Sequence, residues 1–135
     1  MIGDGGFSMT SVELSTIRKY GIPVKMVLFN NGKLGMIKFE QEVLGYPEWG
    51  VDLVNPDFSV LASAYGIESM RIERGANLRN AIRKMLDSDG PFLLEAITDP
   101  EFRPMPPRVT MDQAKGYLVA GLREHVAYSP EIKLE

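Results

Sequence analysis

The sequence contains no cysteine among its 135 residues, and it also lacks long apolar runs and blocks of basic charge. Without cysteine the chain forms no disulfide, binds no zinc through thiolates and has no thiol nucleophile. No apolar run approaches the roughly 20 residues that a membrane-spanning helix needs, and no secretory leader pattern opens the chain. These absences suit a reducing compartment, and we expect a cytoplasmic protein with no transmembrane segment.

Charge of neither sign gathers in one place, because 18 acidic and 15 basic residues are mixed along the chain. The net charge of -3 gives no basic surface for nucleic acid, and we expect no nucleic-acid partner. A content of 44% hydrophobic residues is ordinary for a globular fold with a moderate core. Any anionic ligand must therefore be held by local features rather than by the overall charge.

The pattern of apolar and turn-forming residues along the chain predicts a fold in which strands alternate with helices. Short apolar runs bounded by Gly, Pro, Asn or Asp predict buried strands at 24–29, 68–72 and 92–98. Amphipathic spacing predicts helices at 10–20, 76–87 and about 111–126, and Asp57 is placed to cap another that runs to Tyr65. This alternation indicates an α/β fold with a parallel sheet and right-handed crossovers.

Both ends of this pattern are unusual. Met1 and Ile2 resemble the tail of a buried strand that runs straight into a glycine-rich turn, so we expect a fragment whose upstream strands lie elsewhere; a two-residue leader is the alternative. Residues 99–107 hold four prolines and predict an extended surface arm before the last helix. We therefore predict a division into a ligand-binding part, residues 1–98, and a C-terminal arm with a terminal helix, residues 99–135.

Two turns carry the residues with chemical potential. The segment Gly3-Asp4-Gly5-Gly6 follows the first strand, and Asn30-Asn31-Gly32 follows the strand at 24–29. In a parallel strand-helix-strand unit both turns fall at the carboxyl edge of the sheet, where open α/β folds bind ligands. We therefore expect Asp4 and Asn31 to be neighbours in space, although each turn taken alone is as well explained by ordinary turn chemistry.

The residue types suggest a phosphate group held through a cation. Gly5 and Gly6 let backbone N–H groups approach an anion, and the following helix directs its positive end to the same place. Asp4 and Asn31 offer hard oxygen ligands, which suit Mg²⁺ better than Zn²⁺. Because the first turn contains no Lys or Arg, a cation is the expected neutraliser of the phosphate charge.

At this point the sequence resembles a known family. The segment GDGGFSMTSVELSTIRKYGIPVKMVLFNN is similar to the signature of thiamine-diphosphate enzymes, which opens with GDG and closes with NN. The resemblance continues through LGMIKFEQ, NPDFSVLASAYGI and PMPPRVTMDQAKGY. The last of these segments resembles pyruvate oxidases and quinone-linked pyruvate dehydrogenases more than acetolactate synthases. The resemblance implies a three-layer α/β sandwich with a mostly parallel sheet, here incomplete at its N-terminus.

The resemblance also implies roles for individual residues. Asp4, the side chain of Asn31 and the backbone carbonyl of Lys33 would be the Mg²⁺ ligands. The glycine turn would hold the diphosphate through Gly3, Gly5 and Gly6. The segment after Asn31 would approach the cofactor or substrate, and its residues concerned are Leu34, Gly35, Met36 and Glu40. Met36 is equally well explained as an ordinary apolar helix residue, and Glu40 as a solvated carboxylate rather than a catalytic one.

The family also needs parts that this sequence does not supply. Its members form the reactive cofactor with the help of a glutamate on a pyrimidine-binding domain, normally that of a partner subunit, and pyruvate oxidases bind FAD largely through a middle domain. We therefore expect half of a shared thiamine-diphosphate and Mg²⁺ site, from a homo-oligomeric oxidoreductase, a pyruvate oxidase-like oxidase or dehydrogenase that decarboxylates pyruvate or another 2-oxo acid. The isolated chain is expected to be inactive. An acetolactate synthase-like domain and a non-catalytic assembly module are the alternatives.

Overall fold

The computed structural model describes residues 1–73, 77–102 and 110–127. The chain divides into two compact units, which are described separately below. The first contains Met1–Lys33 and Leu53–Pro100, and the second contains Leu34–Asp52 and Glu101–Glu135. In the described parts of the chain, no helix is long and apolar enough to cross a membrane.

A four-stranded parallel sheet forms the centre of the first unit. Its strands are β1 (Ile2–Gly3), β2 (Lys25–Asn30), β3 (Glu68–Ile72) and β4 (Phe92–Ile97), in the spatial order β1-β2-β4-β3. The predicted α/β fold with a parallel sheet is confirmed. Strand β4 lies in the interior of the sheet, and helices pack on both of its faces, which explains its nearly continuous apolar sequence.

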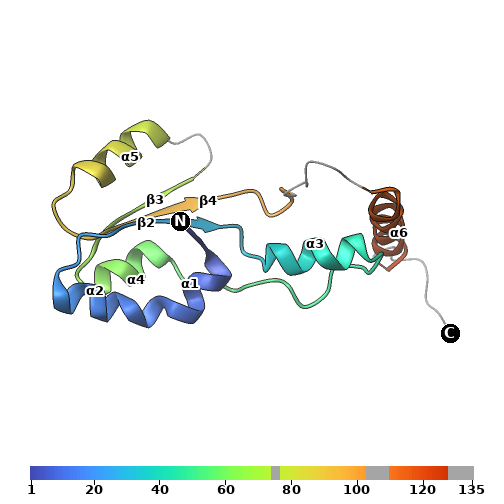
Figure 1. Ribbon diagram of the computed structural model, residues 1–135, viewed down its shortest axis with the longest axis horizontal. Coiled ribbons are helices and arrows are strands. Elements are labelled where there is room, and N and C mark those ends of the chain that lie inside the picture. The colour runs from blue at the N-terminus through green and yellow to red at the C-terminus, as the bar shows by residue number, and fades with distance from the viewer. Residues whose placement is uncertain (74–76, 103–109, 128–135) are drawn as a thin grey trace. The chain divides into compact units, whose positions relative to one another are not determined.

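Helices cover both faces of this sheet (Figure 1). One face carries α1 (Asp4–Thr10), the 3₁₀ turn Ser11–Glu13, α2 (Leu14–Tyr20) and α4 (Phe58–Ala64), and the other carries α5 (Leu78–Asp87). Asp57 caps α4 as predicted, since its carboxylate accepts a 3.0 Å hydrogen bond from the backbone N–H of Val60. The result is a layered arrangement of helix, sheet and helix.

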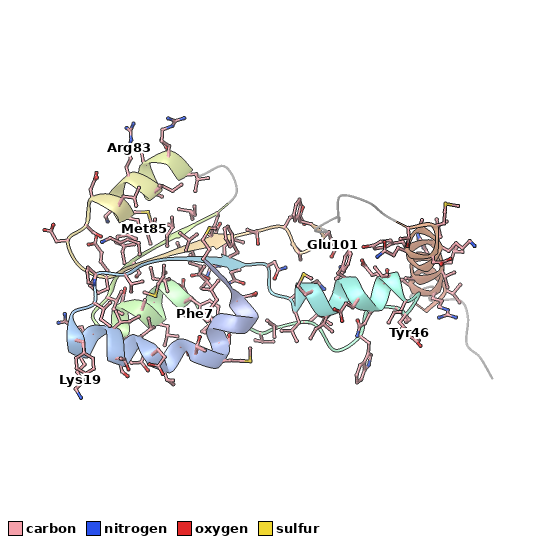
Figure 2. All side chains as sticks on the ribbon, in the orientation of Figure 1. Phe7, Lys19, Tyr46, Arg83, Met85 and Glu101 are labelled. Atoms are coloured by element: carbon pink, nitrogen blue, oxygen red, sulfur yellow. The ribbon has the colours of Figure 1, made fainter. Side chains whose placement is uncertain are left out.

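Two hydrophobic cores hold the layers together, one on each face of the sheet. Alternate residues of β4 serve the two cores: Leu93 packs with the α1, α2 and α4 side, and its neighbours Phe92 and Leu94 pack with α5. In the first core the rings of Phe7 and Phe58 meet edge to face, with their centroids 5.3 Å apart. Figure 2 shows Phe7 and Met85 directed toward the sheet from opposite sides, whereas Arg83 points away from it.

The start of the first helix differs from the prediction. The sequence indicated a glycine turn followed by a helix at 10–20, but helix α1 already begins at Asp4 and a 3₁₀ turn separates it from α2. The physical reason is that Phe7 and Leu14, both buried, anchor two successive helical segments to the same core. Gly5 and Gly6 therefore lie in the first helical turn, where backbone N–H groups have no partner within the helix.

Two helices packed at close range make up the described part of the second unit. They are α3 (Gly35–Val43) and α6 (Met111–Ala127), and Thr110 with Gln113 forms a reciprocal capping box at the start of α6. The rings of Phe39 and Tyr117 meet with centroids 5.9 Å apart. The predicted terminal helix is thus present, and most of the proline-rich arm, residues 103–109, lies outside the described residues.

A buried lysine ties the loop after α3 to the segment after β4. Lys38 is 5% exposed, and its Nζ lies 2.7 Å from Glu48 Oε2 and 2.8 Å from Glu101 Oε2. Burial by itself lowers the pKa of Lys38, but the hydrogen bonds and charges of Glu101 and Glu48 outweigh it and raise the pKa above its ordinary value. The predicted boundary between residues 98 and 99 remains a prediction; residues 34–52 fall in the same compact unit as the C-terminal segment.

Candidate cofactor-binding site

A hydrogen bond joins the two predicted turns at the carboxyl edge of the sheet. The backbone N–H of Gly32 donates to Asp4 Oδ2 over 2.8 Å, although a helix pair and strand β2 separate the two residues in sequence. Gly32 has a φ of +68°, a conformation that glycine adopts without steric cost, and this turns its N–H toward Asp4. The GDGG and NNG segments are therefore neighbours in space.

Asp4 is a buried carboxylate surrounded by neutral donors. It is 3% exposed, and its Oδ1 accepts a 3.0 Å hydrogen bond from the N–H of Gly5. Its Oδ2 accepts from Gly32 and also, over 2.7 Å, from the side-chain amide of Asn55. In the described part of the chain no Lys, Arg or His pairs with Asp4.

Asn30, the last residue of β2, connects this cluster to the sheet. Its Oδ1 accepts hydrogen bonds from Asn55 Nδ2 (2.9 Å) and from the N–H of Gly32 (3.2 Å). Its Nδ2 donates over 2.7 Å to Oε1 of Glu95, which lies on the neighbouring strand β4. Asn30 is 8% exposed and Glu95 is fully buried. The cluster is thus rooted in the two central strands.

Glu95 also contacts the helix layer on its side of the sheet. Its Oε2 accepts a 3.1 Å hydrogen bond from the N–H of Ser59 in the first turn of α4, and Arg71 Nη1 lies 3.8 Å from its Oε1. Arg71 lies 3.4 Å from Asp57 Oδ2 as well. The hydroxyl of Ser59, the N–H of Val60 and the charge of Arg71 together lower the pKa of Asp57. A chain of polar contacts therefore runs from Asp4 to the N-terminus of α4.

The remaining residues predicted from the first turn and the NNG segment lie around this cluster. Gly3 ends β1 and caps α1, and Gly5 and Gly6 follow in the first turn of that helix. Asn31 and Lys33 are half-buried in the loop after β2, where Asn31 Oδ1 accepts a 3.1 Å hydrogen bond from the N–H of Lys33. The metal and diphosphate roles assigned to these residues stay predictions.

The other predicted residues belong to the second unit. Leu34 caps α3, Gly35 and Met36 begin it, and Glu40 lies on its exposed surface. Met36 is 62% exposed in the first turn of α3, and both explanations offered for it, a cofactor contact and an ordinary apolar helix residue, stay open. Contact of these residues with a cofactor or substrate also stays a prediction.

Sequence reasoning missed three residues of the polar cluster, namely Asn30, Asn55 and Glu95. One signal was present, because Glu95 interrupts the apolar strand FLLEAI, and a carboxylate buried between strands needs specific partners. Asn55 opens the segment NPDFSVLASAYGI, which resembles the family, but that resemblance gave it no role at the site. Only the three-dimensional contacts identify it.

The chemistry of this cluster fits a divalent cation that bridges phosphate oxygens. The described residues contain no group of three His, Cys, Asp or Glu side chains able to enclose a metal by themselves. A cation at Asp4 would therefore complete its shell with amide and carbonyl oxygens and with the ligand, which is how Mg²⁺ is held in phosphate sites. The unpaired charge of the buried Asp4 and the helix N-terminus beside it suit the cation and the phosphate respectively.

These features define a class: a parallel α/β domain with a buried polar cluster at the carboxyl edge of its sheet, the edge at which open α/β folds bind ligands. Residues 1–96 match the family model described as the C-terminal thiamine pyrophosphate-binding domain of thiamine pyrophosphate enzymes. The match covers most of the chain. The chain therefore belongs to this family, and the predicted recognition of thiamine-diphosphate enzymes is confirmed at that level.

Curated relatives make the likeness more specific. The chain is 36% identical over 115 residues to the putative thiamine pyrophosphate-containing protein YdaP of Bacillus subtilis. This alignment covers 85% of this chain and 20% of that protein. It is 39% identical over 99 residues to the large subunit of acetolactate synthase isozyme 2 of Escherichia coli, which covers 72% of this chain and 18% of that subunit. It is 34% identical over 130 residues to the mitochondrial acetolactate synthase catalytic subunit of Aspergillus candidus, which covers 96% of this chain and 18% of that subunit.

A solved structure agrees with these sequence relationships. The thiamine diphosphate-dependent 4-hydroxybenzoylformate decarboxylase of Rhodococcus jostii RHA1 superposes with a TM-score of 0.67 at 29% identity, and the match covers 73% of this chain and 19% of the decarboxylase. The chain thus spans about a fifth of the length of the relatives that it matches. These comparisons do not single out pyruvate oxidase, which the sequence analysis favoured.

Proposed function

We propose that this chain provides the cation and diphosphate half of a thiamine-diphosphate site in a larger enzyme that decarboxylates 2-oxo acids. The observation that carries the proposal is the hydrogen bond between Gly32 and the buried carboxylate of Asp4, which joins the two turns at one edge of the sheet. Membership of the thiamine pyrophosphate-binding family supports the choice of cofactor. Mg²⁺ is the cation that suits these oxygen ligands.

Within this proposal the residues divide between two tasks. Asp4, the side chain of Asn31 and the carbonyl of Lys33 hold the cation. The N–H groups of Gly5 and Gly6, in the first turn of α1, would donate to the diphosphate, and the N–H of Gly5 would then be shared with Asp4 Oδ1, to which it donates over 3.0 Å. When bound, thiamine diphosphate supplies the electron sink for decarboxylation. The role of this chain is to fix the charged end of the cofactor in place.

The other half of the site comes from elsewhere in the proposed enzyme. A pyrimidine-binding domain of a partner subunit would supply the glutamate that activates the cofactor, so the proposal includes a homo-oligomer. The isolated chain is then expected to bind weakly and to show no turnover with pyruvate. FAD, if the full-length protein binds it, would also depend on residues outside this chain.

Among 2-oxo-acid enzymes, we favour the acetolactate synthase type over the pyruvate oxidase type. The relatives from Escherichia coli and Aspergillus candidus are named as acetolactate synthases, and the second of them aligns with nearly the whole chain. An enzyme of this type joins two molecules of pyruvate to form acetolactate and releases one CO₂. A pyruvate oxidase instead passes two electrons to an acceptor and releases the two-carbon fragment.

Binding measurements test the proposed half-site. Calorimetric titration of the full-length protein with thiamine diphosphate and Mg²⁺ should show a large loss of affinity in the Asp4→Ala variant, because the cation loses its only charged protein ligand. Asp89→Ala is a matched control, since Asp89 is exposed on the loop before β4. Unchanged affinity in Asp4→Ala would overturn the site assignment.

Product analysis tests the proposed type of enzyme. The full-length protein is incubated with pyruvate, thiamine diphosphate and Mg²⁺, with and without an artificial electron acceptor. We expect acetolactate, formed without reduction of the acceptor. Acetate or acetyl phosphate formed together with reduced acceptor would instead identify the pyruvate oxidase type and would leave the diphosphate half-site intact.

A further inference from the structure

Glu95 is the most deeply buried charged group in the described residues of the first unit, and the proposed ligand set does not use it. It is 0% exposed and lies on the central strand β4. A buried carboxylate costs several kcal/mol in lost hydration unless hydrogen bonds replace the water. Two such bonds are present, from Asn30 Nδ2 at 2.7 Å and from the N–H of Ser59 at 3.1 Å.

The hydrogen bond between Asn30 and Glu95 determines which way the side-chain amide of Asn30 faces. A carboxylate only accepts hydrogen bonds, so Glu95 requires the NH₂ of Asn30 on its own side. The carbonyl oxygen of Asn30 must then face the opposite side, where Asn55 Nδ2 and the N–H of Gly32 donate to it. Glu95 thereby fixes an acceptor directly beneath the NNG turn.

Asn55 transmits this arrangement to Asp4. Both hydrogens of its NH₂ group are used, one toward Asn30 Oδ1 at 2.9 Å and one toward Asp4 Oδ2 at 2.7 Å. Since Gly32 also donates to Asp4 Oδ2, that oxygen has two donors for its two lone pairs. Asp4 Oδ1 has a single donor, the N–H of Gly5, and is the oxygen that keeps a lone pair for another ligand.

We infer that Asn55 and Glu95 are positioning residues of the cation site. Through Asn30 they hold the carboxylate of Asp4 in one orientation, with Oδ2 occupied by protein donors and Oδ1 available to the cation. The inference rests on the proposed function, because it assumes that Asp4 binds the cation of the diphosphate group. Metal sites depend on such outer hydrogen bonds, which orient the ligands before the metal arrives.

The test is the Mg²⁺ dependence of thiamine diphosphate binding to the full-length protein. Calorimetric titrations are made at several Mg²⁺ concentrations for the wild type, Asn55→Ala and Glu95→Leu; leucine has no oxygen to accept the hydrogen bond from Asn30, whereas glutamine would keep one. We expect the apparent Mg²⁺ affinity to fall about 10–100-fold in each variant, the range for loss of an outer-shell partner. Raising Mg²⁺ should restore thiamine diphosphate binding, because the cofactor-contacting groups themselves are unchanged.

Matched controls separate positioning from general stability. Asn77→Ala removes a side chain that accepts from the N–H of Asn80 at the start of α5, and it costs about 1 kcal/mol of helix capping without touching the cluster. Glu68→Gln changes an exposed carboxylate that is paired with Lys84. Both controls should keep the wild-type Mg²⁺ affinity, even though Asn77→Ala lowers the melting temperature.

The outcomes distinguish this inference from the function on which it rests. If Asp4→Ala abolishes Mg²⁺-dependent binding while Asn55→Ala and Glu95→Leu bind Mg²⁺ as the wild type does, the positioning roles are wrong and the half-site stands. If Asp4→Ala has no effect, the proposed function itself fails. Should Glu95→Leu not fold, Asn55→Ala decides, because Asn55 is only half-buried and tolerates truncation better.

Discussion

Replacing Gly116 by alanine should disrupt the packing of α6 against α3, although alanine is the better helix former. An added Cβ at Gly116 would lie 2.7 Å from the carbonyl carbon of Val43, 3.3 Å from the carbonyl oxygen of Glu42, and closest of all to the carbonyl oxygen of Val43. These neighbours are backbone atoms at the end of α3, so no side chain can rotate out of the way. The two helices would have to separate.

The size of the effect follows from two opposing terms. Contact between carbon atoms is favourable at about 3.5–4.0 Å, so the helices must move apart by roughly 1 Å. Overpacking of this kind costs about 1–3 kcal/mol, and the involvement of backbone atoms places it near the upper end. The change from glycine to alanine in a helix interior stabilises the helix by about 0.5–1 kcal/mol, which opposes the steric cost. We expect a net destabilisation of about 2 kcal/mol.

Gly121 provides an internal control in the same helix. An added Cβ there meets no atom within 4 Å, so Gly121→Ala should gain the helix-propensity term alone. Because Gly116→Ala and Gly121→Ala share the helix-propensity term, the difference between their free energies of unfolding gives the steric cost at Gly116, about 3 kcal/mol. Hydrogen exchange of peptides from α3 and α6, compared with peptides from β4, measures the effect locally. Equal protection in the two variants would refute the close packing of these helices.

Three further substitutions test other parts of the structure. Lys38→Met should lower the free energy of unfolding by about 1–3 kcal/mol, the range for hydrogen bonds to charged groups. Since the pKa of Lys38 is raised in the folded state, this difference should persist below about pH 10.4 and disappear as the pH rises through the folded pKa; a difference independent of pH up to 12 would argue against the ion pairs. Asp57→Ala should cost about 1 kcal/mol in urea unfolding by removing the cap of α4. Because the pKa of Asp57 is lowered on folding, that contribution should be present above about pH 3.9 and vanish as the pH falls through the folded pKa, and a cost that grew at low pH would contradict the capping role. Phe58→Ala should cost about 3–5 kcal/mol in the same assay, because Phe58 is 1% exposed and packs edge to face on Phe7; a loss below 1 kcal/mol would mean that this core is not packed as described.

Sequence patterns predicted the regular elements of the sheet well, because those patterns are local. The strand at 68–72 was predicted with the bounds of β3, and the other two strands within one residue at each end. Asp57 was identified as a helix cap because a cap depends on residues two or three positions away. The alternation of elements then implied the parallel sheet.

Glycine-rich segments were predicted less well, because glycine permits several conformations and the tertiary environment selects one. The GDGG segment was expected to be a turn, whereas Gly3 ends β1 and the other three residues begin α1, which is anchored by the buried Phe7. Likewise, nothing local indicates that Gly116 lies against the end of α3. Its role depends on two helices that are distant in sequence. Such contacts become visible only in three dimensions.

The candidate site shows the same division between local and non-local information. Asp4 and Asn31 could be found from sequence because each sits in a short motif directly after a strand. Asn55 and Glu95 could not be assigned in this way, since their importance lies in bonds to Asn30 and Asp4 that connect four separate segments.

A buried Glu95 is nevertheless hard to explain by stability alone, because apolar residues of similar size often replace buried charges at no cost. Its partners show what the charge achieves in this fold. It orients the amide group of Asn30, and thereby the NNG turn and Asn55, against a second buried carboxylate, Asp4. Glu95 already has a charge partner, because Arg71 Nη1 lies 3.8 Å from its Oε1, so Asp4 is the carboxylate whose charge a bound cation would neutralise. Under the proposed function, the position of Glu95 is explained by the orientation that it imposes on Asn30 and, through Asn55, on Asp4.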